Sequence, residues 1–98
     1  MQSYVSILRE VRDPRDINAR HPVETILFLT LAATLCGAKS CVEVADFAEG
    51  REKELSEIVD LPYGAPSHDT FSRLFRLLDP AELAKAFTAF MTALRQGP

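Results

Sequence analysis

The chain has 98 residues, of which 47% are hydrophobic and 26% are charged, and its formal net charge at pH 7 is −3. These values predict one globular domain over residues 1–98 and exclude a disordered or fibrous protein. The negative net charge argues against a strongly basic, general nucleic-acid binder. The N-terminal residues show no signal-peptide pattern, so we expect a cytoplasmic protein with its two cysteines reduced.

The charges are distributed unevenly. Residues 40–66 carry two Lys or Arg against seven Asp or Glu, whereas residues 1–39 carry five against four and residues 67–98 carry four against three. A polyanion is therefore expected to approach the first or the last third of the chain.

The first predicted helix begins at Ser3, a favourable capping residue. Its apolar stripe consists of Tyr4, Ile7, Leu8 and Val11. Residues 12–21 have no apolar periodicity and include a proline, so a loop is expected there.

The segment from Pro22 to Cys36 is predicted to be the central helix. Its apolar residues, which include Leu35, point in nearly every direction around a helix, and such a helix belongs in a core. Pro22 suits the first helical position and Gly37 suits a left-handed residue after the last turn. A membrane span is the competing interpretation, but a span needs roughly 20 apolar residues and this run is shorter.

Two further helices are predicted in the acidic third of the chain. Ser40 and Glu43 match a capping box, which predicts a helix to about Ala48 with Val44, Phe47 and Ala48 facing inward. After Gly50, residues 51–60 predict a sparse surface helix whose acidic residues are solvated. Two prolines and a glycine predict a loop over residues 61–66.

The segment from Ser67 to Leu78 predicts a capped amphipathic helix. Its buried stripe follows the spacing i, i+3, i+4, i+7 and consists of Phe71, Leu74, Phe75 and Leu78. The opposite side carries Asp69, Ser72, Arg73 and Arg76.

A last helix is predicted from Asp79 to about Leu94, with Pro80 and Glu82 in its first turn. Its stripe consists of Leu83, Phe87, Phe90, Met91 and Leu94. Because no segment shows strand alternation, the fold class is all-α. We expect a compact bundle of five to six helices around the central apolar helix, with a helix-turn-helix-like arrangement left open.

No catalytic pattern is evident. The contiguous Ser67-His68-Asp69 contains the residue types of a hydrolase triad, but neighbouring side chains at a helix start diverge and cannot form one. The sequence has no glycine-rich phosphate loop and no metal-ligand spacing. We therefore expect no catalytic residues, no metal and no cofactor in this domain.

The polar side of the helix at Ser67 has two interpretations. A helix N-terminus with small polar residues, followed by arginines, is how helix-turn-helix proteins dock on DNA. Alternatively, Asp69 and Arg73 form an ordinary surface ion pair at i, i+4, which is the commoner situation.

Several short segments together resemble a known family. They are Asp13-Pro14-Arg15, His21-Pro22, Cys36-Gly37-Ala38-x-Ser40, Phe47-Ala48, Leu61-Pro62 and, most specific, Pro66-Ser67-His68-Asp69-Thr70-Phe71-x-Arg73-x-Phe75. In this order and spacing they resemble the N-terminal domain of H-repeat-associated insertion-sequence transposases, from about Leu8 to about Leu94.

The resemblance implies a non-catalytic domain of a bacterial transposase, in which a separate DDE catalytic domain that this chain lacks carries the metal-dependent chemistry. The implied role is to bind or position insertion-sequence ends in DNA transposition, a form of DNA recombination. The alternative is a protein-interaction module that docks on the catalytic domain or forms a homodimer. No membrane partner is expected.

The DNA hypothesis assigns the contacts to two regions of the chain. From the helix at Ser67 the candidate residues are Ser67, Thr70, Ser72, Arg73 and Arg76, and from the loop before the central helix they are Arg15 and Arg20. With so few cations, we expect weak binding by the isolated domain.

Overall fold

The computed structural model describes residues 2–9, 11 and 21–96. In these residues it contains six α-helices and no strand, which confirms the all-α class. The helices are α1 (Gln2–Leu8), α2 (Val23–Leu35), α3 (Cys41–Gly50), α4 (Glu52–Leu55), α5 (His68–Leu77) and α6 (Pro80–Gln96).

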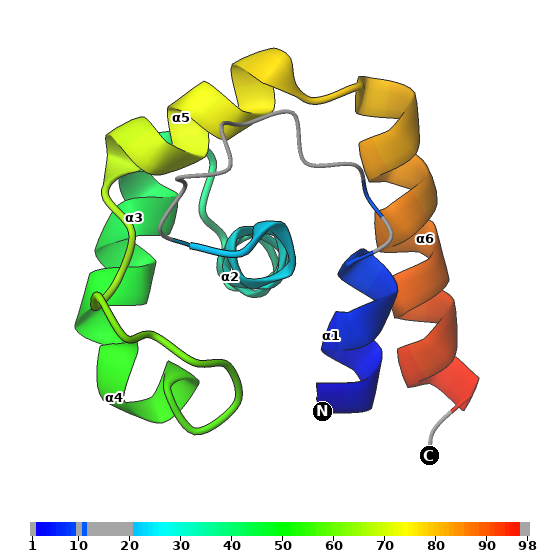
Figure 1. Cartoon of the computed structure of the whole chain (residues 1–98), viewed down its shortest axis with the longest axis horizontal. Coiled ribbons are helices and arrows are strands. Elements are labelled where there is room, and N and C mark those ends of the chain that lie inside the picture. Colours follow the sequence, from blue (N-terminus) through cyan, green and yellow to red (C-terminus); the bar gives the residue numbers. More distant parts are fainter. Residues whose placement is uncertain (1, 10, 12–20, 97–98) are drawn as a thin grey trace.

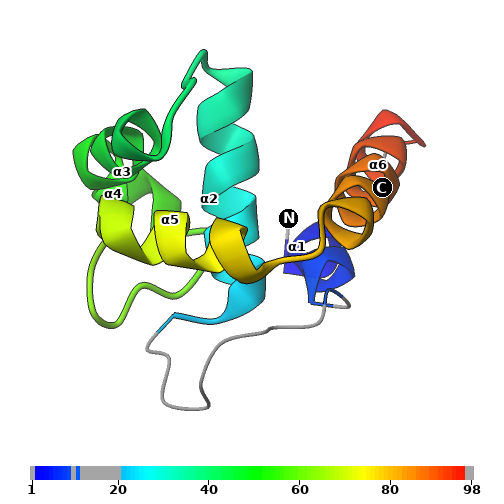
Figure 2. The same cartoon turned by 90° about the horizontal axis from the view of Figure 1, so that it is seen from above.

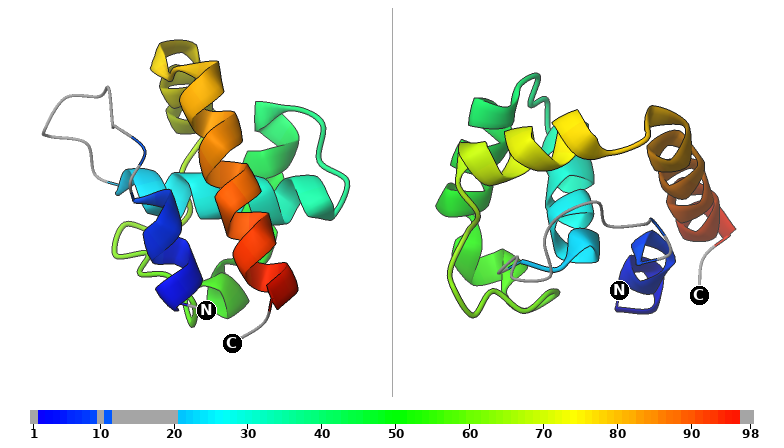
Figure 3. Two further views of the ribbon diagram at one scale, coloured as in Figure 1. Left: turned by 90° about the vertical axis from the view of Figure 1, so that its right-hand side faces the viewer. Right: turned by 45° about the horizontal axis from the view of Figure 1, so that its top comes forward.

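Helix α2 lies in the middle of the bundle (Figures 1 and 2). Helices α3 and α4 lie on one side of it, and α1 and α6 lie on the other. Helix α5 runs across the molecule from α3 toward the start of α6, and α6 packs along α1 (Figure 3). The chain thus surrounds α2 with two pairs of helices that α5 connects.

The central position of α2 follows from its composition. Ile26, Leu27 and Leu29 have no exposed surface, and the Phe28 ring meets the Phe90 ring of α6 edge-to-face at a centroid distance of 6.2 Å. These contacts confirm the predicted core helix. None of the described helices is both long enough and apolar enough to cross a membrane.

The ends of α2 differ in part from the prediction. Gly37 has a φ of +103°, as expected of the left-handed residue after a helix. Pro22 occupies the N-cap position rather than the first helical position. The side chain of Leu35 is 63% exposed, because the last turn of α2 extends past the helices that cover the rest of it.

The predicted capping box at Ser40 forms in part, because the Glu43 side chain binds the N–H of the residue before the cap instead of the N–H of Ser40. Ser40 Oγ accepts a hydrogen bond from the Glu43 backbone N–H at 3.2 Å, while Glu43 Oε1 accepts one from the Lys39 N–H at 3.3 Å. Helix α3 continues to Gly50, beyond the predicted end, and buries Val44 and Ala48.

The sparse helix predicted over residues 51–60 is much shorter than expected. Helix α4 is a single turn, after which the chain bends so that Leu55 and Val59 are both buried. With so few apolar residues, this segment has no continuous stripe that tertiary packing would hold as a longer helix.

The two C-terminal helices follow the predicted pattern closely. Phe71, Leu74 and Leu78 are buried, and Asp79 Oδ1 accepts a hydrogen bond from the Ala81 N–H at 3.0 Å at the start of α6. Met91 is 36% exposed instead of packed in the stripe, and Ala86 is buried. Ala86 fits the helical spacing between Leu83 and Phe90, but the predicted stripe consisted of larger residues and did not include it.

Helix α1 begins at Gln2, so Ser3 lies inside the helix and is not its cap. Leu8 is fully buried, and Val11 is buried although it follows the helix end. The side chain of Tyr4 and the predicted loop over residues 12–20 lie outside the described residues.

Candidate nucleic-acid interface

The outward side of α5 carries the arginines that the sequence selected. The helix buries Phe71 and Leu74, which have no exposed surface, against the rest of the bundle. Arg73 and Arg76 fall on the opposite side and are exposed. Because α5 lies across the outside of the bundle (Figure 3, right), a large partner has access to this side.

The predicted pair between Asp69 and Arg73 does not form in the structure. Asp69 Oδ1 instead lies 3.3 Å from His68 Nε2. Within the described residues, neither Arg73 nor Arg76 takes part in an ion pair. Both guanidinium groups are therefore available to an external anion.

The three small polar residues contribute less than the sequence suggested. Ser67 occupies the N-cap position of α5, but its side chain caps no backbone N–H. Its Oγ instead lies 3.4 Å from Thr70 Oγ1, so each hydroxyl can satisfy the other. Thr70 and Ser72 are half-buried at the edges of the helix.

Acidic side chains flank the N-terminal end of α5. Asp46, Glu49 and Glu52 line a pocket of about 430 Å³ together with Ser67 and His68. Their negative charges oppose the attraction of the helix dipole for a phosphate at this end. The part of α5 suited to an anion is therefore its C-terminal half, with Arg73 and Arg76.

The remaining candidates, Arg15 and Arg20, lie outside the described residues. Among the residues that are described, no group of three or more His, Cys, Asp or Glu side chains is placed to hold a metal ion. The described residues thus include an exposed, arginine-bearing side of α5.

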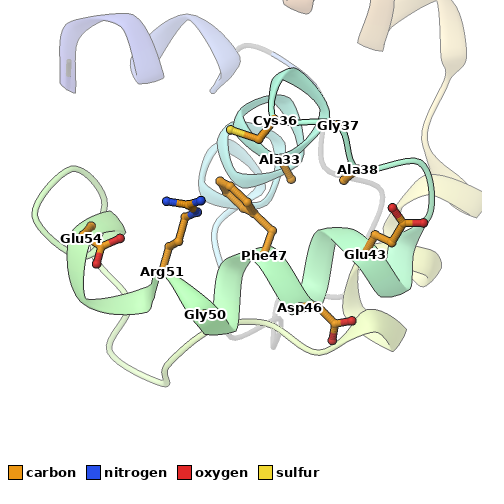
Figure 4. A pocket seen from close by; sticks show the side chains of 10 residues that line it. All are labelled: Ala33, Cys36, Gly37, Ala38, Glu43, Asp46, Phe47, Gly50, Arg51 and Glu54. Atoms are coloured by element: carbon orange, nitrogen blue, oxygen red, sulfur yellow. The ribbon is translucent and has the colours of Figure 1, made fainter.

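A second surface lies where the end of α2 meets α3 and α4 (Figure 4). An open groove of about 620 Å³ is lined there by Cys36, Phe47 and Arg51, with Glu43 and Glu54 among its acidic members. The Arg51 guanidinium carbon lies 5.2 Å from the centroid of the Phe47 ring, which is cation–π distance. Periodicity alone did not indicate this groove, because residues far apart in the sequence form it.

The sequence matches the family described as DDE_Tnp_1-associated over residues 5–91. An uncharacterized protein from the dhlA 3′ region of Xanthobacter autotrophicus is 37% identical over 89 residues, which are 89% of this chain and 30% of that protein. The putative transposase YncI of Escherichia coli O157:H7 is 31% identical over 88 residues, which are 90% of this chain and 22% of that protein. The H repeat-associated putative transposase YbfD of Escherichia coli strain K12 is 29% identical over 91 residues, which are 93% of this chain and 35% of that protein.

This chain therefore spans between about a fifth and about a third of the length of these relatives. No solved structure matches it. The family match covers most of the chain, and two of these relatives are named as putative transposases. The chain belongs to the DDE_Tnp_1-associated family, as its resemblance to the N-terminal domain of H-repeat-associated transposases predicts.

Proposed function

We propose that this chain is a transposase accessory domain that binds insertion-sequence ends through the outward side of α5. Arg73 and Arg76 make the main contacts to DNA phosphates, and Ser72 contributes from the edge of the helix. Arg15 and Arg20 add contacts from the segment before α2. The chemistry of transposition is carried out by the part of the relatives that this chain does not cover, and this domain positions the DNA for that reaction.

The observation that carries this proposal is the availability of the two arginines. An arginine already paired with a carboxylate has part of its hydrogen-bonding capacity occupied, whereas an unpaired guanidinium can donate two parallel hydrogen bonds to a phosphate. Arg73 and Arg76 are exposed, lie on the side of α5 opposite its buried residues, and make no ion pair within the described residues.

The acidic end of α5 determines how the helix meets DNA in this proposal. Asp46, Glu49 and Glu52 repel phosphates from the N-terminal end, so the DNA backbone approaches the C-terminal half. Ser67 and Thr70 then lie at the edge of the contact and contribute less than the two arginines.

Fluorescence anisotropy with a labelled terminal inverted repeat tests the proposal. The double variant Arg73→Ala/Arg76→Ala should lose about tenfold or more in affinity, because each arginine supplies a charged hydrogen bond to phosphate. The matched control is Lys85→Ala/Arg95→Ala, which removes two exposed cations from α6 and should bind nearly as the parent does. The thermal midpoint of both variants should stay close to that of the parent, because all four side chains lie off the core.

Two results would overturn the proposal. One is equal loss of binding in the α5 and α6 variants, which would indicate a general charge effect. The other is no binding by the parent chain even at low salt.

The groove at the end of α2 supports a second candidate function, docking on the catalytic part of a transposase. Its acidic rim with Glu43 and Glu54 favours a basic protein segment over DNA, and Phe47 offers an apolar surface within it. Light scattering coupled to size exclusion, with the chain alone and mixed with the remainder of a full-length transposase, distinguishes a docked complex, a homodimer and an isolated monomer.

A further inference from the structure

We infer that Glu52 is a positioning residue for α5, because its carboxylate fixes the turn through which the chain enters that helix. The sequence places Glu52 in an acidic run that predicts only a solvated helix face. In the structure, Glu52 Oε1 accepts a hydrogen bond from the Ala65 backbone N–H at 2.7 Å, across 13 residues of sequence.

The turn is built closely against this carboxylate. Gly64 has a φ of +78°, and its N–H donates to the Leu61 carbonyl oxygen at 3.0 Å. A Cβ atom at Gly64 would lie 3.2 Å from Glu52 Oε1, which is a tight contact. Glu52 therefore binds the backbone N–H of Ala65 and leaves little room for a side chain at Gly64, the residue before it.

The distance along the chain from this contact to α5 is short. Only Pro66 and Ser67 separate Ala65 from His68, the first residue of α5. Pro66 is buried, and its ring fixes one backbone angle. Helix α5 also packs on α3, which directly precedes α4. The start of α5 is therefore held at two points, by its packing on α3 and by the contact of Glu52 in α4 with the turn before it.

The negative charge of Glu52 makes its two possible roles distinguishable, because they predict opposite changes in DNA affinity when the side chain is removed. Glu52 lines the acidic pocket at the start of α5, so its negative charge by itself weakens DNA binding. Removing that charge should strengthen binding if Glu52 is only a surface acid. If Glu52 holds α5 in position, its removal should weaken binding, because fewer molecules then present the helix correctly.

Three variants separate these two effects. Glu52→Ala removes both the charge and the acceptor, and Glu52→Gln removes the charge but keeps an oxygen acceptor. Glu54→Ala removes one charge from the same helix, and its side chain makes no hydrogen bond or ion pair within the described residues. All three change the net charge by the same amount.

Hydrogen exchange of the Ala65 amide, followed by NMR on the whole chain, tests the contact without DNA. The exchange rate should rise about tenfold or more in Glu52→Ala, remain near the parent value in Glu54→Ala, and be largely restored in Glu52→Gln. The backbone amide shifts of Thr70 and Phe71 should change only in Glu52→Ala. Unchanged exchange and unchanged shifts in Glu52→Ala would overturn the inference.

The anisotropy assay then tests the effect on DNA, and this second arm rests on the proposed function. Glu52→Ala should bind about threefold or more weakly than the parent, while Glu54→Ala and Glu52→Gln bind as well or better. Tighter binding by Glu52→Ala would overturn the positioning role. Failure of the parent chain to bind DNA refutes the proposed function instead, and the exchange measurements still decide whether Glu52 positions α5.

Discussion

Arginines in the described residues differ in what surrounds their charge. Arg9 forms an ion pair with Glu24, and Arg51 lies over the Phe47 ring. Arg73, Arg76 and Arg95 have neither kind of partner among the described residues. Arg73 and Arg76 lie one turn apart on one side of α5, whose opposite side is buried, whereas Arg95 lies near the end of α6. This pairing of two unpartnered arginines on one side, rather than the number of cations, makes α5 the candidate DNA-binding element.

Alanine substitution of two glycines should change the stability of the fold in opposite directions. Gly64→Ala should destabilise the fold by about 1 to 2 kcal/mol, because its φ of +78° disfavours any side chain and the new Cβ would crowd Glu52. Gly50→Ala should stabilise it by about 0.5 to 1 kcal/mol, because Gly50 is helical, has no positive φ, and has open space around it. Urea unfolding of both variants measures the difference, and equal stability of the two would contradict the turn geometry.

At the scale of elements, α2 and α5 contribute in different ways. Helix α2 is enclosed by its neighbours and supplies core on nearly every side. Helix α5 buries one stripe and leaves the other side exposed, with its start fixed by the turn at Gly64 and Ala65. One element stabilises the bundle, while the other keeps an exposed polar side.

The exposed end of α2 allows a matched test of its central role. Leu29→Ala should lower the free energy of unfolding by about 2 to 5 kcal/mol, because Leu29 is fully buried and the substitution leaves a cavity. Leu35→Ala, on the same helix, should change it by less than about 0.5 kcal/mol, because Leu35 is 63% exposed. Thermal or urea melts followed by circular dichroism measure both. Similar effects of the two substitutions would refute the placement of α2.

The whole molecule combines a net charge of −3 with two exposed arginines on one side of α5. The acidic residues of α3 and α4 line the groove at the end of α2 and the pocket at the start of α5, whereas Arg73 and Arg76 lie further along α5. In the proposed complex, the DNA contact surface would therefore be small and bordered by repulsive charge.

This charge distribution predicts a moderate dependence of DNA binding on salt. Each neutralised phosphate contributes roughly −0.9 to the slope of the logarithm of the association constant against the logarithm of salt concentration, so we expect a slope of about −3 to −5. Anisotropy titrations over a salt series measure it. A much steeper slope would mean that further cations join the contact, and a slope near zero would contradict phosphate binding.

Much of the fold was predictable from the sequence because it depends on local signals. The apolar composition of α2, the left-handed Gly37, the Ser40 cap of α3 and the stripe of α5 all act within one or two helical turns. The predictions failed where packing decided the outcome. Leu35 is exposed because no helix covers it, and α4 is short because its few apolar residues are buried by a bend.

The sequence by itself determined the helical class, the central helix, the arginine-bearing side of α5 and the family to which the chain belongs. Only the tertiary structure decided that Asp69 does not pair with Arg73, that acidic side chains of α3 and α4 flank the start of α5, and that Glu52 binds the turn before it. The physical reason is the separation along the sequence of the residues that interact. Helix periodicity acts over three or four residues, whereas the acidic pocket and the Glu52 contact join residues from different helices and loops, and only chain folding brings them together. Asp69 and Arg73 lie on one helix, where the spacing permits a pair but does not decide which neighbour the carboxylate contacts.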